Sequence, residues 1–397
     1  MRELGYRPFD ADNHYYEAED AFTRHVEKRM QKRCVEWVEL RGRRRILVGG
    51  KLDKFIPNPS FDPVSAPGAL EDYFRGVNPS GKSMAELFGN LQPIQPAFRN
   101  RDARLTAMDA QGVERVLLFP TLGCGIEAPL AHDPEATLAA LSGFNRWLED
   151  DWGYAYQGRI FAVPMLSLAA PELALAELER VLGLGARMVY LRPAPVPRAH
   201  GSVGFGDAAH DPFWARCAEA GVAVAFHTGD SGYGRHVAAW EGAKQMEGFR
   251  GMAFGMATMQ GRAIIDTMAS LIVHGVFARH PRLRVCSIEN GAFWVPWLFS
   301  NLKKAYGQMK WAFAEDPRET FKRHVWIAPY FEDDIRALAD LIGAPHVLFG
   351  SDFPHAEGLA NPLDFTKELA AFSESDVRRI MLDNVEFIAT PQPGWRA

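Results

Sequence analysis

The sequence has few cysteines and no long apolar run. Its 397 residues include only 4 cysteines, which lie far apart and form no Cys-x-x-Cys pair. Isolated thiols of this kind are typical of a reducing compartment. No stretch approaches the roughly 18 uncharged apolar residues that a membrane helix needs, and the opening MRELGYRPFD contains no apolar signal segment. We therefore expect a cytoplasmic protein.

An excess of charge of one sign is also lacking. Lysine and arginine number 44, aspartate and glutamate number 49, and no block of a single sign occurs. A formal net charge of -5 gives no attraction to nucleic acid or to an anionic membrane. Hydrophobic residues make up 47% and charged residues 23%, as in ordinary globular proteins. The expected partner is therefore a small-molecule substrate.

Eight short β-rich runs recur along the chain, separated by segments of helical periodicity. The runs are nearly continuous in apolar residues, which is typical of parallel strands with helices on both faces. Eight βα units favour a single α/β domain over residues 1–397, a distorted (β/α)8 TIM barrel, although an open eight-stranded sheet gives the same alternation. The runs cover residues 6–12, 114–120, 159–166, 186–193, 222–229, 282–288, 324–330 and 346–352, and the clearest helical segments cover 171–185, 211–221, 261–281, 294–311 and 333–343.

A long stretch rich in proline and glycine separates the first two runs. It spans residues 15–104 and contains FIPNPSFDPVSAPG and GVNPSGKSMAELFGN. A loop of this length inside a compact domain is usually functional or disordered. We interpret it as an insertion after the first strand that forms a lid over the barrel mouth.

Polar residues that can bind a metal follow three of the predicted strands. The first run ends in Asp10-Ala11-Asp12-Asn13-His14, where Asp12 and His14 are two residues apart and share one side of a strand. His227 ends the fifth run and Asp352 the eighth. In a barrel such strand ends converge, and two imidazoles with two carboxylates suit one Zn²⁺ ion, or alternatively Mn²⁺.

From DADNH through AFHTGD and HGVFARHPRLRVCSIENGAFWVP to LFGSDFPHAEG, the chain resembles a known family. This is the amidohydrolase-related branch of the amidohydrolase superfamily, which includes aminocarboxymuconate-semialdehyde decarboxylase and aromatic-acid decarboxylases. The resemblance implies a distorted (β/α)8 barrel, a homo-oligomer such as a dimer, and one divalent metal ion. Carried over by motif, the metal ligands are Asp12, His14, His227 and Asp352.

The chain departs from this family at two positions. Asp12 stands where the relatives usually have His or Glu. After the sixth strand the decarboxylases have His-Gly-Gly with a catalytic His, whereas this chain has Glu289-Asn290-Gly291. A glutamate can transfer a proton if its pKa is raised, but it adds negative charge where an anionic substrate binds. We therefore predict catalytic roles for Glu289 and Asp352.

Five further residues near the predicted mouth are candidates for substrate binding. Arg192 either clamps a substrate carboxylate or forms a buried ion pair. Tyr233 and His236 either donate to an oxyanion or are exposed. Trp294 and His355 are candidates to border the pocket.

Three functions compete. The first is a metal-dependent hydrolase in which Asp352 accepts a proton from water and Glu289 assists the leaving group. The alternative is a metal-dependent, non-oxidative decarboxylase of an aromatic or enoic acid. The third is a catalytically inactive barrel that binds a ligand or uses the metal structurally. The predicted site does not favour it, because structural zinc sites are usually rich in thiolates and this site has carboxylates and no thiol. Glu289 favours hydrolysis, and the many aromatic residues favour a small aromatic or planar substrate that bears a carboxylate.

Overall fold

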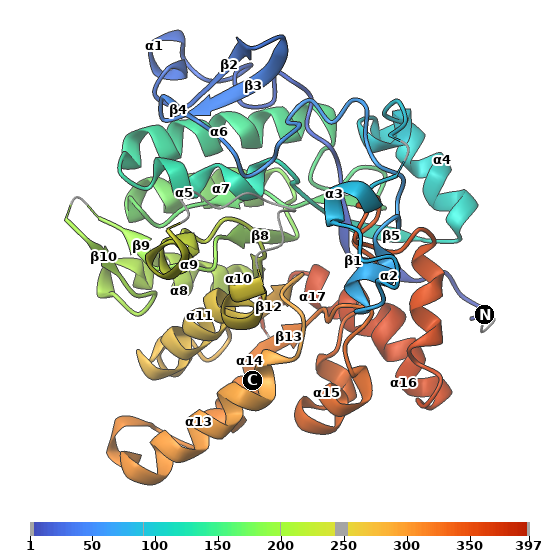
Figure 1. Ribbon diagram of the computed structural model, residues 1–397. Coiled ribbons are helices and arrows are strands. Elements are labelled where there is room, and N and C mark those ends of the chain that lie inside the picture. The colour runs from blue at the N-terminus through green and yellow to red at the C-terminus, as the bar shows by residue number, and fades with distance from the viewer. Residues whose placement is uncertain (1–3, 90, 199, 243–252, 395–397) are drawn as a thin grey trace.

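The computed structural model describes residues 4–89, 91–198, 200–242 and 253–394 as a ring of parallel strands with helices outside it (Figure 1). One parallel sheet has the strand order β1-β5-β6 and the other β13-β12-β11-β8-β7. The strands are β1 (Phe9–His14), β5 (Arg115–Phe119), β6 (Ile160–Ala162), β7 (Met165–Leu166), β8 (Met188–Leu191), β11 (Ala223–His227), β12 (Val285–Ile288) and β13 (Val325–Ile327).

Two of the predicted runs join these sheets into a barrel. The third run is divided into β6 and β7 at Pro164, which has no N–H to donate. The eighth run is not a regular strand, but the N–H of Leu348 donates to Ile327 O and the N–H of Ala11 to Phe349 O, each at 2.8 Å. It therefore connects β13 to β1, and the predicted distorted (β/α)8 barrel is confirmed.

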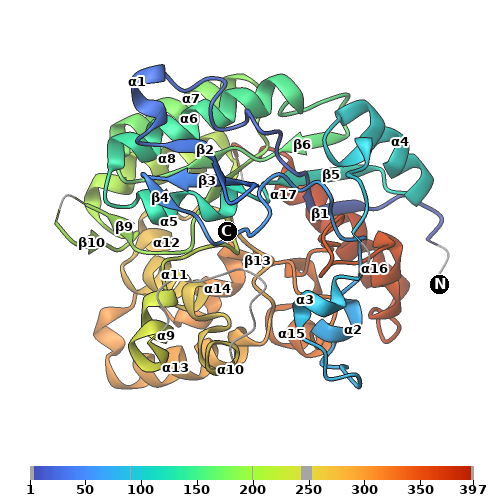
Figure 2. The ribbon, with the colours of Figure 1, turned by 45° about the horizontal axis from the view of Figure 1, so that its top comes forward.

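Helices follow the strands and surround the barrel, as Figure 2 shows from a second direction. Several begin with proline in the first turn, where its missing N–H costs nothing. The segment predicted as one helix over 261–281 is two, because left-handed Gly275 separates them. The principal helices are α4 (Arg101–Gln111), α6 (Pro134–Asp151), α7 (Pro171–Gly183), α8 (Asp211–Ala220), α11 (Arg262–Val273), α12 (Val276–Arg279), α13 (Trp294–Gln308), α14 (Pro317–His324), α15 (Ile335–Ile342), α16 (Glu374–Arg378) and α17 (Asn384–Ala389).

The core fills the space within and behind the barrel. All the residues of the barrel strands are buried except Arg115, and the four cysteines are buried and free. None of the helices in the described ranges has the length and apolar character needed to cross a membrane.

The stretch between β1 and β5 has more regular structure than its loop-like composition indicates. An antiparallel sheet of order β2-β3-β4 forms around the Arg41-Gly42 turn, whose two residues have positive φ. The predicted boundary at residue 104 falls inside α4, which begins at Arg101 after the Asn100 cap. The elements of this stretch are α1 (Lys28–Gln31), β2 (Val35–Leu40), β3 (Arg43–Val48), β4 (Lys51–Leu52), α2 (Glu71–Phe74) and α3 (Met84–Leu87).

Candidate metal centre and active site

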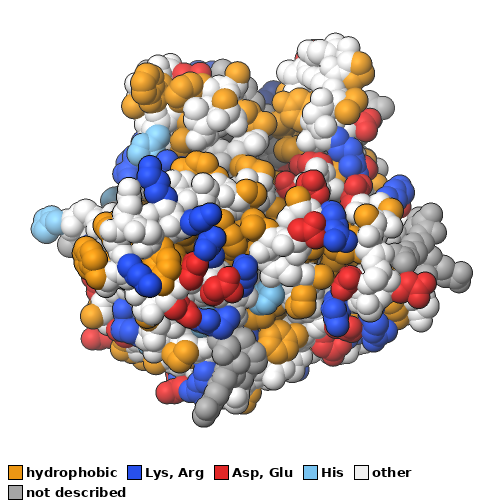
Figure 3. Space-filling model, turned by 90° about the horizontal axis from the view of Figure 1, so that it is seen from below, with side chains coloured by type: hydrophobic (Ala, Val, Ile, Leu, Met, Phe, Trp, Pro, Cys, Tyr) orange, Lys and Arg blue, Asp and Glu red, His pale blue; other side chains and the backbone are white. Residues whose placement is uncertain are grey.

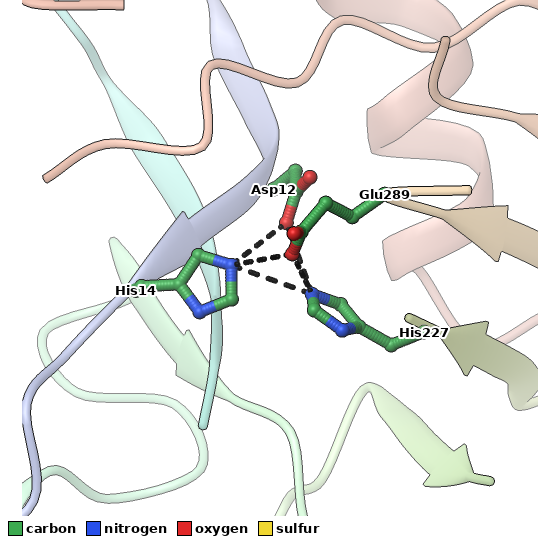
Figure 4. A group of neighbouring side chains, drawn as sticks. All are labelled: Asp12, His14, His227 and Glu289. Carbon is green, nitrogen blue, oxygen red and sulfur yellow. Dashed lines mark hydrogen bonds and ion pairs between the residues drawn. The ribbon is translucent and has the colours of Figure 1, made fainter. Parts of the chain in front are cut away.

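Five side chains meet at the carboxyl ends of the barrel strands, and four of them are drawn in Figure 4. Asp12 and His14 lie on β1, His227 ends β11, and Glu289 directly follows β12. The Nε2 atom of His14 lies 3.2 Å from Asp12 Oδ1 and 3.4 Å from Glu289 Oε2. The Nε2 atom of His227 lies 3.4 Å and 3.1 Å from the same two oxygens. Asp352 Oδ1 is 3.3 Å from His14 Nε2, so two imidazoles and three carboxylates form one cluster.

The two imidazoles of this cluster direct lone pairs toward the same point. His14 Nδ1 lies 3.2 Å, and His227 Nδ1 2.8 Å, from a backbone carbonyl oxygen. A ring that donates from Nδ1 has an unprotonated Nε2 in its neutral form. The two Nε2 atoms are 3.3 Å apart, and the buried atoms Asp12 Oδ1 and Asp352 Oδ1 lie 3.2 and 3.3 Å from His14 Nε2. Such groups repel one another unless positive charge lies between them, so this donor set fits a divalent cation.

Glu289 and Asp352 approach the centre from unusual backbone conformations. Their φ angles are 53° and 55°, in the left-handed region that side chains other than glycine rarely adopt. Such conformations cost on the order of 1–3 kcal/mol and are concentrated at functional sites. The hydroxyl of Tyr330 donates to the carbonyl oxygen of Glu289 at 2.9 Å and helps to hold this turn.

Buried Asp10 holds together the two segments that carry Asp12 and Asp352. Its Oδ1 accepts the N–H groups of Asp12 at 3.1 Å and Ser351 at 3.0 Å. Its Oδ2 accepts from Asn13 Nδ2 at 3.0 Å and from the Ser351 hydroxyl. Burial raises the pKa of Asp10 to about 7 despite these hydrogen bonds. Asp10 therefore positions two members of the cluster.

Glu17, just after β1, has a similar positioning role for the loop that follows β5. Its carboxylate accepts the backbone N–H groups of Thr121, Leu122 and Gly123 at 3.1, 2.9 and 2.9 Å. Three N–H groups directed at one buried carboxylate fix the loop conformation. The loop in turn places Thr121 beside His355.

His355 is the partner of Asp352 on the side away from the other imidazoles. Its Nδ1 lies 2.6 Å from Asp352 Oδ1, and its Nε2 lies 2.9 Å from Thr121 Oγ1. Because the Thr121 hydroxyl donates to Tyr15 O at 2.7 Å, its oxygen accepts from His355 Nε2. The ring also stacks on His14 at 4.0 Å. Nε2 of His355 is thus hydrogen-bonded within the protein, and its Nδ1 faces Asp352.

The carboxylates favour positive charge on the two clustered imidazoles. Burial opposes protonation of both rings. Hydrogen bonds to Asp12 and Glu289 nevertheless raise the pKa of His14. Cys124 and Glu289 raise the pKa of His227 well above its ordinary value. The cluster therefore attracts a cation strongly.

The carboxylates themselves divide into two kinds. Burial alone would raise the pKa of Glu289, but the two imidazoles outweigh it and hold this pKa well below its usual range. Burial, with repulsion from Glu289 and Glu357, raises the pKa of Asp352 well above its usual range. Glu289 therefore stays ionised, whereas Asp352 is suited to accept a proton.

A cavity of about 1070 Å³ opens over the cluster and reaches Asp12, Glu289 and Asp352. Figure 3 shows the surface hollowed between two projecting parts. The cavity walls include residues from the stretch after β1 and from the loop after the eighth run. This volume suits a small organic substrate, since such pockets measure about 300–1,000 Å³. The larger apolar and aromatic side chains of the walls are Tyr73, Phe74, Tyr233, Val237, Met256, Met259, Ile264, Phe293, Tyr330 and Phe331.

The predicted substrate-binding residues lie in different places. Tyr233 borders the cavity, and its hydroxyl donates to Asp266 Oδ2 at 3.0 Å. His236 is exposed on α9 (Gly234–Glu241), beside Tyr233 but not among the residues that line the cavity.

Arg192 and Trp294 are both buried and contact other protein groups rather than the main cavity. Arg192 is buried with its Nε 3.7 Å from Glu127 Oε2, beside a separate, much smaller cavity. This is the ion-pair alternative rather than the substrate clamp. Trp294 is buried, and its Nε1 donates to Gly291 O at 2.9 Å. Neither residue belongs to the described walls of the main cavity.

Sequence reasoning missed Glu357, Tyr330 and Thr121. Glu357 borders the cavity in the loop that follows Asp352. The sequence signal that could have identified Glu357 is its position five residues after Asp352, at the predicted barrel mouth. The Tyr330 hydroxyl contacts the backbone of Glu289, and the Thr121 hydroxyl contacts His355. No residue pattern in the sequence predicts either contact.

Comparison with known proteins agrees with this geometry. The amidohydrolase family model matches residues 91–386, so the chain belongs to the amidohydrolase family and is a metal-dependent enzyme of that superfamily. A solved amidohydrolase from Mycobacterium avium subsp. paratuberculosis K-10 is 48% identical, covers 99% of this chain and 100% of its own, and has a TM-score of 0.94.

Two more distant structures share the fold. A dihydroxybenzoic acid decarboxylase from Polaromonas sp. JS666, solved with manganese and 2-nitroresorcinol, is 20% identical over 82% of this chain and 94% of its own, with a TM-score of 0.53. The 5-carboxyvanillate decarboxylase of Sphingomonas paucimobilis is 16% identical over 98% and 100%, with a TM-score of 0.56.

Proposed function

We propose that this protein is a hydrolase that uses one divalent metal ion, Zn²⁺ or Mn²⁺, to cleave a small aromatic or planar ester or amide. The observation that carries the proposal is the cluster at the base of the cavity, where two imidazole Nε2 atoms and three carboxylates converge. The ligands are Asp12, His14, His227, Glu289 and Asp352. A bound ion supplies Lewis-acid chemistry, because it polarises a carbonyl group and lowers the pKa of water.

Asp352 accepts the proton of the attacking water. Its raised pKa makes it the most basic carboxylate of the cluster, and its Oδ1 lies 2.6 Å from His355 Nδ1. A proton taken by Asp352 can therefore be shared with His355. Thr121 and the His14 ring hold His355 in the orientation that this transfer needs.

Glu289 acts as a ligand rather than as a mobile acid. Its Oε2 lies within 3.4 Å of both Nε2 atoms, and the imidazoles hold it ionised. This differs from the leaving-group role expected from the sequence.

The walls of the cavity are rich in carboxyl groups. The described walls carry six carboxyl side chains and one lysine, Lys54. Burial raises the pKa of four of these groups, and a bound divalent ion would offset the charge of the ligand carboxylates, so the walls accept an uncharged or an anionic substrate. The acidic residues are Asp12, Glu289, Glu332, Asp333, Asp352 and Glu357.

The stretch over residues 15–104 is proposed to act as the lid and specificity element. It contributes Lys54, Tyr73, Phe74 and Asn78 to the cavity walls. The paired rings of Tyr73 and Phe74, with centroids 5.7 Å apart, offer an aromatic surface to a planar substrate.

The test is hydrolysis of neutral benzoate esters and benzamides by the purified protein. We expect turnover that is lost on chelation and restored by Zn²⁺ or Mn²⁺. Release of carbon dioxide from a 2-hydroxy aromatic acid, without hydrolysis of any ester or amide, would contradict the proposal in favour of decarboxylation.

A further inference from the structure

Asn290 is a neutral polar side chain at the base of the cavity. It follows Glu289 directly, lines the cavity wall and is 8% exposed. Its Nδ2 atom donates to Phe226 O at 2.9 Å and to Ile288 O at 2.8 Å, near the ends of β11 and β12. Phe226 and Ile288 immediately precede His227 and Glu289. The amide group of Asn290 is therefore held beside two members of the metal cluster.

The two backbone contacts determine how this amide group is oriented. A carbonyl oxygen can only accept a hydrogen bond, so both neighbours require the NH2 group of Asn290 and exclude the reversed orientation. The other atom of the amide, Oδ1, accepts no hydrogen bond among the described contacts, and it is not one of the buried oxygen atoms that lack a partner. Oδ1 is therefore open to the cavity, where it presents an acceptor and no donor.

The other neutral polar groups of the described wall differ from Asn290 in this respect. Asn78 also lines the cavity, but its Oδ1 already accepts the hydroxyl hydrogen of Ser80 at 3.0 Å. The hydroxyl groups of Thr228 and Ser231 can rotate and can either donate or accept. Asn290 thus offers a neutral acceptor whose orientation two backbone groups fix.

We infer that Asn290 is a specificity-determining residue that accepts a hydrogen bond from the N–H group of a substrate amide. The inference rests on the proposed hydrolase function and narrows its substrates from esters and amides to amides. An amide carries a donor next to its carbonyl group, and this N–H can pair with Oδ1. The corresponding ester oxygen has no hydrogen, so it would meet Oδ1 lone pair to lone pair.

The discrimination depends on what happens when the substrate lacks the N–H group. Asn290 cannot turn its acceptor away, because Nδ2 would then lose both of its backbone partners. An ester therefore leaves Oδ1 covered and unpaired, which is the usual basis of selection by a polar site. A neutral hydrogen bond of this kind changes affinity by roughly three- to tenfold.

The experiment compares N-methylbenzamide with methyl benzoate, two neutral compounds of similar shape that differ by N–H against O. Initial rates with the metal-loaded wild type and Asn290→Ala give kcat/KM for each compound. The intrinsic reactivities cancel when the amide-to-ester ratio of kcat/KM is compared between the two proteins. We expect this ratio to fall roughly three- to tenfold in Asn290→Ala, chiefly through the KM of the amide. The metal content and kcat/KM of methyl benzoate should change less than about twofold.

Two further variants separate the acceptor of Asn290 from its structural contacts. Asn290→Asp loses both N–H contacts but keeps an oxygen atom as an acceptor, so it should keep or raise the amide-to-ester ratio. Asn78→Ala is the matched control on the same wall, because the Oδ1 of Asn78 is paired with Ser80. It should leave the ratio as in the wild type.

The inference is overturned, and the hydrolase function stands, if Asn290→Ala loses activity equally toward both compounds. It is also overturned if Asn290→Asp loses the ratio as Asn290→Ala does, because the backbone contacts would then account for the whole effect. A selective loss for the amide in Asn290→Ala, with the ratio kept in Asn290→Asp and Asn78→Ala, supports it.

Failure of the hydrolase function gives a different result. If the wild type hydrolyses neither compound, hydrolysis is overturned, and the same two compounds become stable ligands whose dissociation constants calorimetry can measure. A preference of the wild type for N-methylbenzamide that disappears in Asn290→Ala then supports the acceptor role of Asn290. Equal affinity of the wild type for the two compounds, or binding of neither, overturns it.

Discussion

At the residue scale, the cluster is a cation site built from mutually repelling groups. The Nε2 atoms of His14 and His227 lie 3.3 Å apart, and buried carboxylate oxygens surround them. Neutralising such a set is worth more than any single hydrogen bond, because the groups are buried. Substitutions of different ligands should therefore reduce the amount of bound metal to different extents.

Substitution of His227 and of Asp352 should abolish turnover by different routes. His227→Ala removes a nitrogen ligand and should deplete the bound metal, measured by elemental analysis of the purified variant. Asp352→Asn can still ligate weakly through its amide oxygen but cannot accept a proton. We expect it to keep part of its metal and lose at least about 100-fold in kcat. Wild-type activity in Asp352→Asn would refute its role as the base.

Glu289→Gln should weaken metal binding and not only alter the pH–rate profile. Its carboxylate lies within 3.4 Å of both imidazoles, so the amide replaces a charged ligand by a neutral one. We expect the apparent metal affinity to fall roughly 10- to 100-fold, measured by titration of the stripped protein. Unchanged affinity with loss of one limb of the pH–rate profile would return Glu289 to the acid–base role expected from the sequence.

The sequence predicted part of the site. Asp12, His14, His227 and Asp352 were predictable because each follows or ends an apolar strand, where barrel geometry brings side chains together. The ligand position of Glu289 was not, since it depends on a left-handed φ at the strand end.

At the element scale, the loop after the eighth run has the strictest packing requirement. Gly358→Ala would place a Cβ 2.5 Å from Asp352 O and 2.8 Å from Ser351 O, against backbone that cannot yield easily. We expect the variant to be destabilised by about 1–3 kcal/mol and to lose activity, measured by denaturant unfolding and by turnover.

Gly307→Ala on α13 is the matched control. A Cβ at Gly307 meets nothing within 4 Å, and alanine has the better helix propensity. It should raise the free energy of unfolding by about 0.5–1 kcal/mol. Equal effects of the two substitutions on the free energy of unfolding would mean that the close contact at Gly358 does not affect stability.

The elements themselves were predictable to different degrees. Periodicity and proline starts identified helices such as α7 and α8 almost to the residue. The antiparallel β2-β3-β4 sheet was missed because the prolines from Pro57 onward led the whole stretch to be interpreted as a loop, although residues 35–52 contain none. The eighth run reads as a strand and does hydrogen-bond to β1 at Phe349, Asp352 and Phe353, but the left-handed φ of Asp352 prevents a regular strand there.

At the scale of the whole molecule, the metal centre joins segments from β1 to the eighth run. A bound ion stabilises the folded state by an amount that rises with the logarithm of its free concentration, about 2.7 kcal/mol at 100 times the dissociation constant. Chelation should therefore lower the unfolding temperature of the wild type, followed by differential scanning fluorimetry. It should have little effect on His227→Ala, which serves as the metal-poor control. Identical shifts in both proteins would place the metal elsewhere.

The most direct test of the account is the metal content of the purified wild-type protein, measured by elemental analysis against protein concentration. The cluster brings ligand atoms of Asp12, His14, His227 and Glu289 within 4.8 Å of one another and places Asp352 Oδ1 3.3 Å from His14 Nε2. It therefore predicts about one divalent ion per chain, Zn²⁺ or Mn²⁺. An active preparation with no metal, or one with two ions per chain, would contradict the mononuclear centre on which the proposed hydrolysis depends.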